Sequence, residues 1–356
     1  AAAAGSLAGT AEFREMGLEA QRQSVVLLEN GHLPDGSAAL PLRNRPRLYV
    51  ENVAADVAER YGTLVEDPAE ADVAVLRLRT PYQPKGRGFL SRLFHHGDLD
   101  FKGKELERIL GLLESVPTIV DIHLERAAVI PEIAEAAAGL LATFGEDAEL
   151  AAQMTVAYIR GFQGVALGAE SVSCMVKHFP GGGPQEDGLD PHFLWGKEQV
   201  YPGDNFEYHL TPFVAAFDAG VEQVMPYYGI PVGQTSEDVA MGFNKDIITG
   251  LLRERFGFHG VVCTDWQIAE GPKLLGGVTV MRARAWGVED LSVPERYAKA
   301  IAAGVDQFGG QESPHHLVEL VRTGIVTEAR IDESVRRILT IKFKLGLFDD
   351  PYVDAA

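Results

Sequence analysis

Short apolar runs alternate with segments of helical spacing along most of this chain. In the first 145 residues, apolar runs at 47–50, 72–78 and 118–124 predict strands. Helical spacing is found over residues 12–28, 54–61, 103–113 and 130–141. Alternation of this kind is typical of a parallel or mixed sheet covered by helices. We therefore predict an α/β layered domain over residues 1–145.

The same alternation continues over residues 146–356. Helices are predicted at 150–162, 210–218, 246–256 and 332–343, and strands are predicted to end at His178, Tyr228, Asp265 and Phe308. This amounts to about four βα units, whereas a closed barrel needs eight. We predict a partial (β/α)8 barrel. Its open sheet edges and apolar surface would need strands from another chain, either a second copy or a different partner.

Three of the predicted strands end in residues that can carry chemistry. The apolar run 261–263 is continuous, which predicts a strand buried on both faces, and Asp265 and Trp266 follow it. The carboxyl ends of such strands are where barrel enzymes place their reacting groups. As an alternative, Asp265 could cap the next helix. The sequence does not decide between these two interpretations at this point.

The other two strand ends carry groups that suit a sugar. Lys177 and His178 end one predicted strand and precede a glycine loop, and Tyr227 and Tyr228 end another. A cation, an imidazole and phenols can bind hydroxyl groups by hydrogen bonding. Three polar strand ends, separated by helix-length segments, favour a single shared site.

Composition narrows the classes of partner. The formal charge of −19, without a basic cluster, argues against nucleic acid and against an anionic membrane surface. No apolar run approaches the roughly 18 residues of a membrane span, and residues 1–10 lack signal-peptide features, so we expect a cytoplasmic protein. Cys174 and Cys263 fall in predicted interior strands and should be free thiols. No spacing suggests metal ligands, and we expect neither metal nor cofactor.

Several motifs in one order resemble glycoside hydrolase family 3, the β-glucosidase and β-N-acetylglucosaminidase family. They are Lys177-His178-Phe179-Pro180-Gly181, the strand 225–228, the run 251–260 that leads to Thr264-Asp265-Trp266, and the segments 331–338 and 345–348. The resemblance implies a retaining, exo-acting hydrolase that cleaves terminal β-linked sugars through a covalent glycosyl-aspartate intermediate. It implies that Asp265 is the nucleophile. It assigns sugar binding to Lys177, His178, Tyr228 and Trp266, with Tyr227 as an adjacent candidate.

The resemblance also bears on domain order. Residues 19–28 are similar to the opening helix and strand of the family's α/β-sandwich domain, and residues 121–144 to a later strand and helix. That domain usually follows the barrel, whereas here it would precede it. The first barrel strands have no counterpart in this sequence, so the chain resembles a rearranged or truncated enzyme.

The acid/base remains open at this point. In many relatives it is a Glu on a sandwich-domain loop, but the corresponding stretch here, residues 80–101, contains no Glu. The conventional proton donors in that stretch are Asp98, Asp100, His95 and His96.

A second candidate for the acid/base follows the Lys-His strand. Asp190-Pro191-His192 is similar to the Asp-x-His dyad of bacterial β-N-acetylglucosaminidases. An Asp that pairs with a His fixes its tautomer and favours its charged form. Asp190 could instead form only turn hydrogen bonds.

Aromatic stacking on sugar rings is a further expectation, with Trp195, Tyr201 and Trp266 as candidates. Two alternative functions stay open. One is a catalytically incomplete or partner-dependent sugar-binding chain, and the other is a glycoside phosphorylase or β-N-acetylglucosaminidase that uses the Asp-His dyad.

Overall fold

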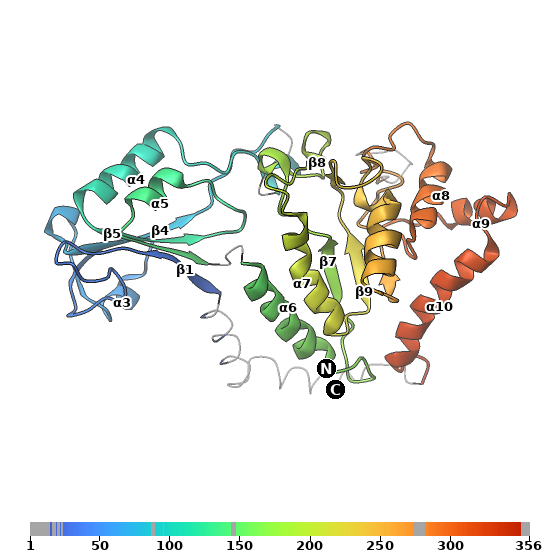
Figure 1. Ribbon diagram of the computed structural model, residues 1–356, viewed down its shortest axis with the longest axis horizontal. Helices are drawn as coiled ribbons and strands as arrows, with labels where there is room; N and C mark the ends of the chain where they lie inside the picture. Colours follow the sequence, from blue (N-terminus) through green and yellow to red (C-terminus); the bar gives the residue numbers. More distant parts are fainter. Residues whose placement is uncertain are drawn as a thin grey trace. The chain divides into compact units, whose positions relative to one another are not determined.

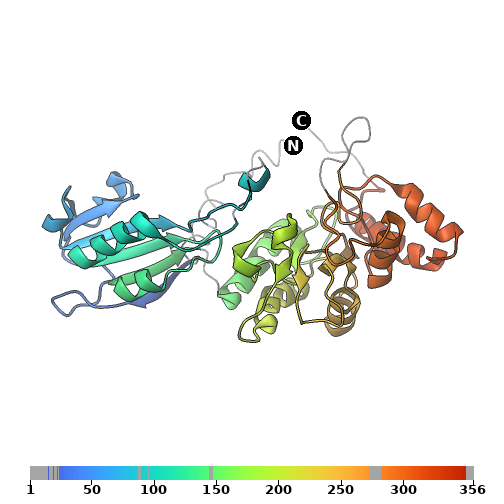
Figure 2. The same ribbon diagram turned by 90° about the horizontal axis from the view of Figure 1, so that it is seen from above.

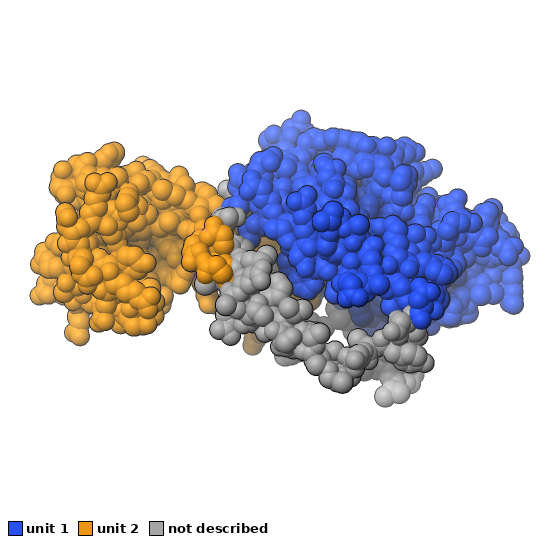
Figure 3. All heavy atoms as spheres, turned by 90° about the horizontal axis from the view of Figure 1, so that it is seen from below, with its two compact units in different colours: residues 1–2, 147–356 blue, residues 3–146 orange. Residues whose placement is uncertain are grey.

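A computed structural model describes residues 24–86, 90–94, 96–143, 147–272 and 282–349, together with residues 15, 19 and 22. The chain divides into two compact units, residues 3–146 and residues 147–356 with residues 1–2 (Figure 3). Each unit has its own sheet and its own apolar core. Within the described residues, no helix is both long enough and apolar enough to cross a lipid bilayer.

The unit of residues 3–146 is built on a six-stranded sheet in the order β1-β6-β5-β4-β2-β3. The strands are β1 (Val25–Asn30), β2 (Arg47–Glu51), β3 (Thr63–Leu64), β4 (Val73–Arg79), β5 (Thr118–His123) and β6 (Gly139–Thr143). β1 pairs antiparallel with β6, and the other neighbouring pairs are parallel. The helices are α3 (Ala55–Ala58), α4 (Gly103–Ser115) and α5 (Pro131–Ala136), with short 3-10 turns η1 (Pro68–Glu70) and η2 (Leu90–Arg92).

α4 and α5 lie on the same face of this sheet (Figure 1). Alternate side chains of β4 and β5, among them Leu76, Val120 and Ile122, are fully buried and pack in one cluster with Ile109 of α4. This is the period-two pattern of a strand with one face on a core. The predicted α/β layered architecture is confirmed.

Two local predictions in this unit are wrong. The helix predicted over residues 130–141 ends at Ala136, and residues 139–143 form β6, which pairs in parallel with β5. The run of alanines favours a helix locally, but Leu140 and Ala142 are buried only when this segment joins the sheet, and tertiary packing overrides propensity. The helical spacing over residues 12–28 likewise gives way to β1 from Val25 onward, because this segment forms hydrogen bonds with β6.

The unit that begins at Asp147 contains a three-stranded parallel sheet in the order β11-β9-β7. Its strands are β7 (Met175–Phe179), β8 (Glu198–Gln199), β9 (Gln223–Pro226), β10 (Ile230–Pro231) and β11 (Val261–Val262), with β8 and β10 forming a separate parallel pair. Its α-helices are α6 (Ala148–Gln163), α7 (Phe206–Asp218), α8 (Val293–Ala303), α9 (Pro314–Arg322) and α10 (Glu328–Lys344). The remaining helical segments are η3 (Glu186–Gly188), η4 (Leu194–Gly196), η5 (Met241–Phe243) and the π-helix η6 (Asp246–Arg255).

α6 and α7 pack side by side next to β7 and β9, and α8, α9 and α10 gather on the β11 side of the unit (Figures 1 and 2). The described residues contain no closed barrel. The strand predicted over residues 304–308 is wrong in extent, because only Gln307 forms a parallel bridge, to Cys263, before the chain turns at Gly310. Cys174 lies just before β7 and is partly buried, and Cys263 is buried. Both are free thiols.

Candidate active site

The three parallel strands bring the predicted site residues to one edge of the sheet. In the register of the sheet, Val224 of β9 lies between Val176 of β7 and Val262 of β11, so all three strands end at the same edge. His178, Tyr228 and Asp265 lie at or just beyond those ends. The three polar strand ends found in the sequence therefore lie together at one edge of the sheet.

Asp265 and His178 form the centre of this place. The Asp265 side chain is only 9% exposed, and its Oδ2 lies 3.3 Å from His178 Nε2. Its Oδ1 accepts a hydrogen bond of 2.7 Å from the backbone N–H of Trp266. The peptide bonds before His178 and before Pro180 are cis. The carboxylate is thus fixed through both oxygens at a strand end, and not at the start of a helix.

Burial controls the charge of His178. It lowers the pKa of the imidazole to about 4, with Lys177 and His192 acting in the same direction and Asp265 opposing them. At neutral pH His178 is therefore uncharged. A neutral imidazole can donate one hydrogen bond and accept another, which suits a binding role better than the role of a charged acid.

Tyr228 lies buried beside Asp265 and Trp266. Its ring is buried, and its hydroxyl donates a hydrogen bond of 2.7 Å to the carbonyl oxygen of Trp266. Burial and the nearby Asp265 carboxylate raise the pKa of this phenol, so it stays protonated. The Arg284 guanidinium carbon lies 5.8 Å from the centroid of the Tyr228 ring, and Arg284 is also buried. Sequence reasoning missed Arg284, because no local pattern separates it from a surface arginine.

The Asp190-Pro191-His192 segment belongs to the same place. Asp190 Oδ1 lies 2.6 Å from His192 Nδ1 and also accepts a 2.8 Å hydrogen bond from the backbone N–H of His192. The turn bond and the side-chain pair are therefore both present. The His192 ring packs edge-on against Tyr228 with centroids 4.8 Å apart. Trp286 is buried and donates from Nε1 to the Pro191 carbonyl at 2.7 Å, which anchors this loop.

The remaining sugar-binding candidates differ in exposure. Lys177 is exposed on β7. Tyr227 is buried, and its hydroxyl accepts a hydrogen bond from Gln185. Trp266 is 59% exposed, so part of its ring remains open for stacking. Gly310 lies directly beside this ring, where an added Cβ would be only 2.3 Å from it, and its positive φ also favours glycine.

The two other aromatic candidates are less open to a sugar. Trp195 stacks on Phe193, with ring centroids 4.9 Å apart and the ring planes almost parallel. Tyr201 is buried among Phe206 and His209. Both have packing partners within the unit.

The alternative acid/base candidates lie in the other unit. Asp98 forms an ion pair with Lys102, and this hydrogen bond holds the pKa of the Asp98 carboxyl below its usual range. An ionised carboxylate is a poor proton donor at neutral pH. Asp100 also lies near Lys102, and His96 is buried against the Ser91 carbonyl at 2.8 Å. His95 lies outside the described residues. Among the described residues, no group of three or more His, Cys, Asp or Glu side chains is arranged to hold a metal ion.

The family described as "Glycosyl hydrolase family 3 N terminal domain" matches residues 120–341, more than half of the chain. The chain belongs to glycosyl hydrolase family 3. The resemblance inferred from the sequence motifs is therefore confirmed. The match to family 3 begins in β5 and so extends across the boundary between the two units. The assignment of residues 1–145 to a sandwich domain and 146–356 to a barrel domain remains a proposal.

This chain is similar to several family 3 proteins over part of their length. The chain is 54% identical over 213 residues to "Probable beta-glucosidase C" of Aspergillus oryzae, covering 60% of this chain and 33% of that protein. It is 44% identical over 227 residues to "Periplasmic beta-glucosidase/beta-xylosidase" of Dickeya chrysanthemi, covering 60% of this chain and 35% of that protein. A solved β-glucosidase from Listeria innocua in complex with glucose is 28% identical, with a TM-score of 0.47, over 59% of this chain and 27% of that one. The chain spans about a third of the length of the curated relatives it matches.

The depressed pKa of His178 predicts a specific loss of stability in acid. As pH falls from about 6.5 to about 4, the unfolded chain binds a proton at this residue while the folded chain does not. The contribution of His178 to the free energy of unfolding should therefore fall by roughly 2 kcal/mol between pH 7.5 and 4.5. Urea unfolding of the wild type and of His178→Asn at both pH values measures it. The variant should lose less stability than the wild type, and equal losses would contradict the prediction.

Proposed function

We propose that this chain carries the site of a retaining, exo-acting β-glycosidase, with terminal β-glucosides as substrate. The observation that supports this most directly is the Asp265 carboxylate, buried at the end of β11 and 3.3 Å from a neutral His178. Its relatives are named β-glucosidases, one of them also a β-xylosidase, which favours a neutral sugar. The formal charge of −19 is compatible with an uncharged substrate.

In the proposed reaction, one oxygen of Asp265 attacks the anomeric carbon. The bond to the leaving oxygen breaks, and an ester between the sugar and Asp265 forms. His192, paired with Asp190, donates the proton that the leaving oxygen needs. In the second step, the neutral imidazole of His192 takes a proton from a water molecule, and this water attacks the anomeric carbon. The ester bond breaks, the sugar leaves and the Asp265 carboxylate is regenerated. His178, Lys177 and Tyr227 bind sugar hydroxyls, and Trp266 stacks on the ring.

A second candidate function is a site that works only together with another chain. α6 and the segment before β7 line an open groove of about 570 Å³, which is the size of a small-ligand cleft. Its apolar side chains include Tyr158, Phe162 and Val172, which are 64%, 50% and 58% exposed. β7 is an edge strand of its sheet. Exposed apolar side chains beside a sheet edge favour cover by a further βα unit, from a second copy or from another protein.

We also propose a reducing, cytoplasmic location, since both cysteines are free thiols.

Covalent trapping tests the proposed function. The protein is incubated with a 2-deoxy-2-fluoro β-glucoside, and its intact mass is measured before peptide mapping. The glucoside carries an activated leaving group, and one adduct per chain, on the peptide that holds Asp265, is the expected result. The fluorine slows both formation and hydrolysis of the ester, and the leaving group speeds only its formation, so the ester accumulates. Folded protein without an adduct would argue against an independent β-glucosidase and favour the partner-dependent function. Phosphate-dependent formation of a sugar 1-phosphate would instead indicate a phosphorylase.

The role of His192 predicts a leaving-group effect. His192→Gln should lower kcat/KM for an alkyl β-glucoside by roughly 10²- to 10⁴-fold, because a general acid contributes about that much. The loss should be far smaller for a dinitrophenyl β-glucoside, whose leaving oxygen needs no proton. Steady-state kinetics on both substrates measures this difference. If Asp98→Asn shows the effect and His192→Gln does not, the acid/base is Asp98.

A further inference from the structure

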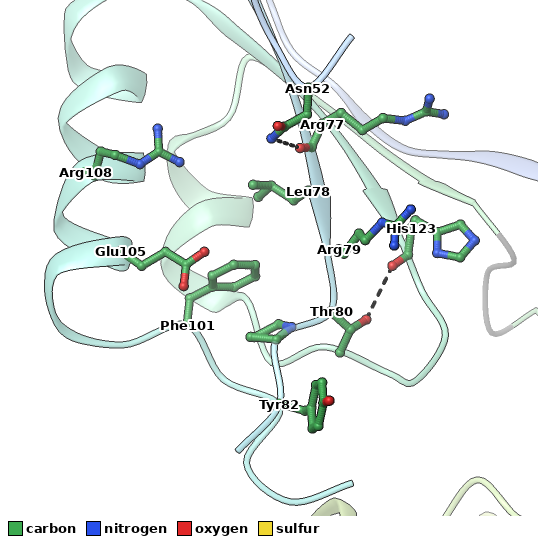
Figure 4. A pocket seen from close by; sticks show the side chains of 11 residues that line it. Asn52, Arg77, Leu78, Arg79, Thr80, Tyr82, Phe101, Glu105, Arg108 and His123 are labelled. Carbon is green, nitrogen blue, oxygen red and sulfur yellow. Dashed lines mark hydrogen bonds between the residues drawn. The ribbon is translucent and has the colours of Figure 1, made fainter. Parts of the chain in front are cut away.

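The unit of residues 3–146 has a large pocket of its own, and none of the residues that line it is assigned to sugar cleavage. The pocket has a volume of about 900 Å³ and lies at the carboxyl ends of the parallel strands β2, β4 and β5 (Figure 4). Its walls include Asn52, the segment 77–82, His123 and the first turns of α4. This volume is within the range of pockets that hold small organic ligands.

The strand order places this pocket at a topological switch point. From β2 the chain moves to β3 on one side, and it then returns to β4 on the other side of β2. The connections that leave β2 and β4 therefore diverge to opposite directions and leave a crevice between them. In open α/β sheets, ligands bind in the crevice beyond the carboxyl ends of the strands at such a point.

The charged groups around the pocket favour an anion. Arg77 pairs with Asp121 at 2.9 Å, and Arg108 pairs with Glu51 at 2.6 Å. Arg79, by contrast, makes no ion pair with any described residue and lies exposed at the end of β4. Figure 4 shows Arg108 extending from α4 on one side of the pocket, and Arg79 beside His123 on the other.

Two further features narrow the class of anion. The side chain at the N-cap of α4 makes no capping hydrogen bond, so the first N–H groups of this 13-residue helix have no side-chain acceptor there. A helix N-terminus together with arginine side chains favours a phosphate group. Tyr82 and Phe101 also line the pocket, and aromatic rings suit the apolar faces of a sugar or a base.

We propose that this pocket binds a small phosphate ester with a ring-shaped body, such as a sugar phosphate or a nucleoside monophosphate. Arg79 is the main phosphate ligand, and Arg108 shares its charge between Glu51 and the ligand. Glu105, which extends from α4 toward the pocket, opposes the anion and limits its affinity (Figure 4). The assignment does not depend on glycosidase activity.

Isothermal titration calorimetry of the whole chain tests the proposal, with glucose 6-phosphate, AMP and inorganic phosphate as probes. Glucose, adenosine and citrate serve as controls for the ring and for negative charge alone. Arg79→Gln should weaken binding by about tenfold or more, because it removes a charged hydrogen-bond donor. Glu105→Gln should tighten binding severalfold. Arg43→Gln, an exposed arginine of the same unit outside the pocket lining, should leave the affinity unchanged.

The relative affinities for glucose 6-phosphate and AMP identify the class of phosphate ester that the pocket binds. Tighter binding of glucose 6-phosphate than of AMP indicates a sugar phosphate, and the reverse order indicates a nucleotide. Either order, with the loss in Arg79→Gln, supports the site. The proposal is overturned if none of the phosphate esters binds, if citrate binds as well as they do, or if Arg79→Gln and Arg43→Gln bind alike.

Discussion

Replacement of Asp265 by Asn is expected to lower kcat/KM for an aryl β-glucoside by roughly 10⁴-fold or more, because no ester can form without the carboxylate. The amide has almost the same shape, and its Oδ1 can still accept the hydrogen bond from the Trp266 backbone that Asp265 accepts now. The variant should therefore fold and still bind glucose. Steady-state kinetics and the far-UV circular dichroism spectrum together separate loss of chemistry from loss of structure.

A smaller replacement makes the assignment sharper. In Asp265→Gly, added azide can enter the space left by the carboxylate and attack the anomeric carbon of an activated β-glucoside. The product should be the α-glucosyl azide, because one displacement replaces two and the configuration inverts. Asp218→Asn, at an exposed position on α7, is the matched control and should keep full activity. Retention of more than a tenth of the activity by Asp265→Asn would show that another group is the nucleophile.

The site residues could be predicted because each lies at or shortly after the end of a short apolar run. Asp265 comes three residues after the buried β11, and His178 lies within β7. Parallel strands align their carboxyl ends, so polar residues at those ends meet whatever the loops do between them. The dyad of Asp190 and His192 was recognised for a different reason, namely its similarity to the Asp-x-His dyad of bacterial β-N-acetylglucosaminidases, and the two side chains do pair in the structure.

The features that the sequence did not predict depend on contacts between segments that are far apart in the sequence. The strand over residues 139–143 is recognisable only once β5 is present to pair with it. Arg284 reaches Tyr228 from more than 50 residues away, and the segment around it has no periodic pattern. Asp306 is a third example, because nothing nearby in the sequence marks it as a buried charge. The motif at residues 331–338, noticed only for its resemblance to family 3, supplies two of its partners, Ser334 and Arg337.

Asp306 links α10 to β11, the strand that precedes Asp265. Its carboxylate has no exposed surface and lies 2.7 Å from both Arg253 and Arg337, with Arg330 at 3.7 Å. It also accepts hydrogen bonds from Ser334 and from the backbone N–H of Val262 in β11. Burial already lowers the pKa of Arg253 to about 10, with Asp306 opposing that shift. One carboxylate therefore compensates the charge of three partly buried arginines.

Replacement of Asp306 by Asn should therefore lower the free energy of unfolding by about 3 to 5 kcal/mol, because removal of one partner leaves buried charges uncompensated. Urea unfolding at neutral pH measures this loss, and Asp332→Asn, at an exposed position of α10, is the control that should change it by less than about 0.5 kcal/mol. Adding Arg337→Leu to Asp306→Asn should recover part of the loss, since it removes one of the stranded charges. Without such recovery, the loss would reflect the hydrogen bonds to Ser334 and Val262 and not the charge.

Because Val262 immediately precedes the segment that holds Asp265, the folded fraction of Asp306→Asn should also show weaker covalent trapping than the wild type.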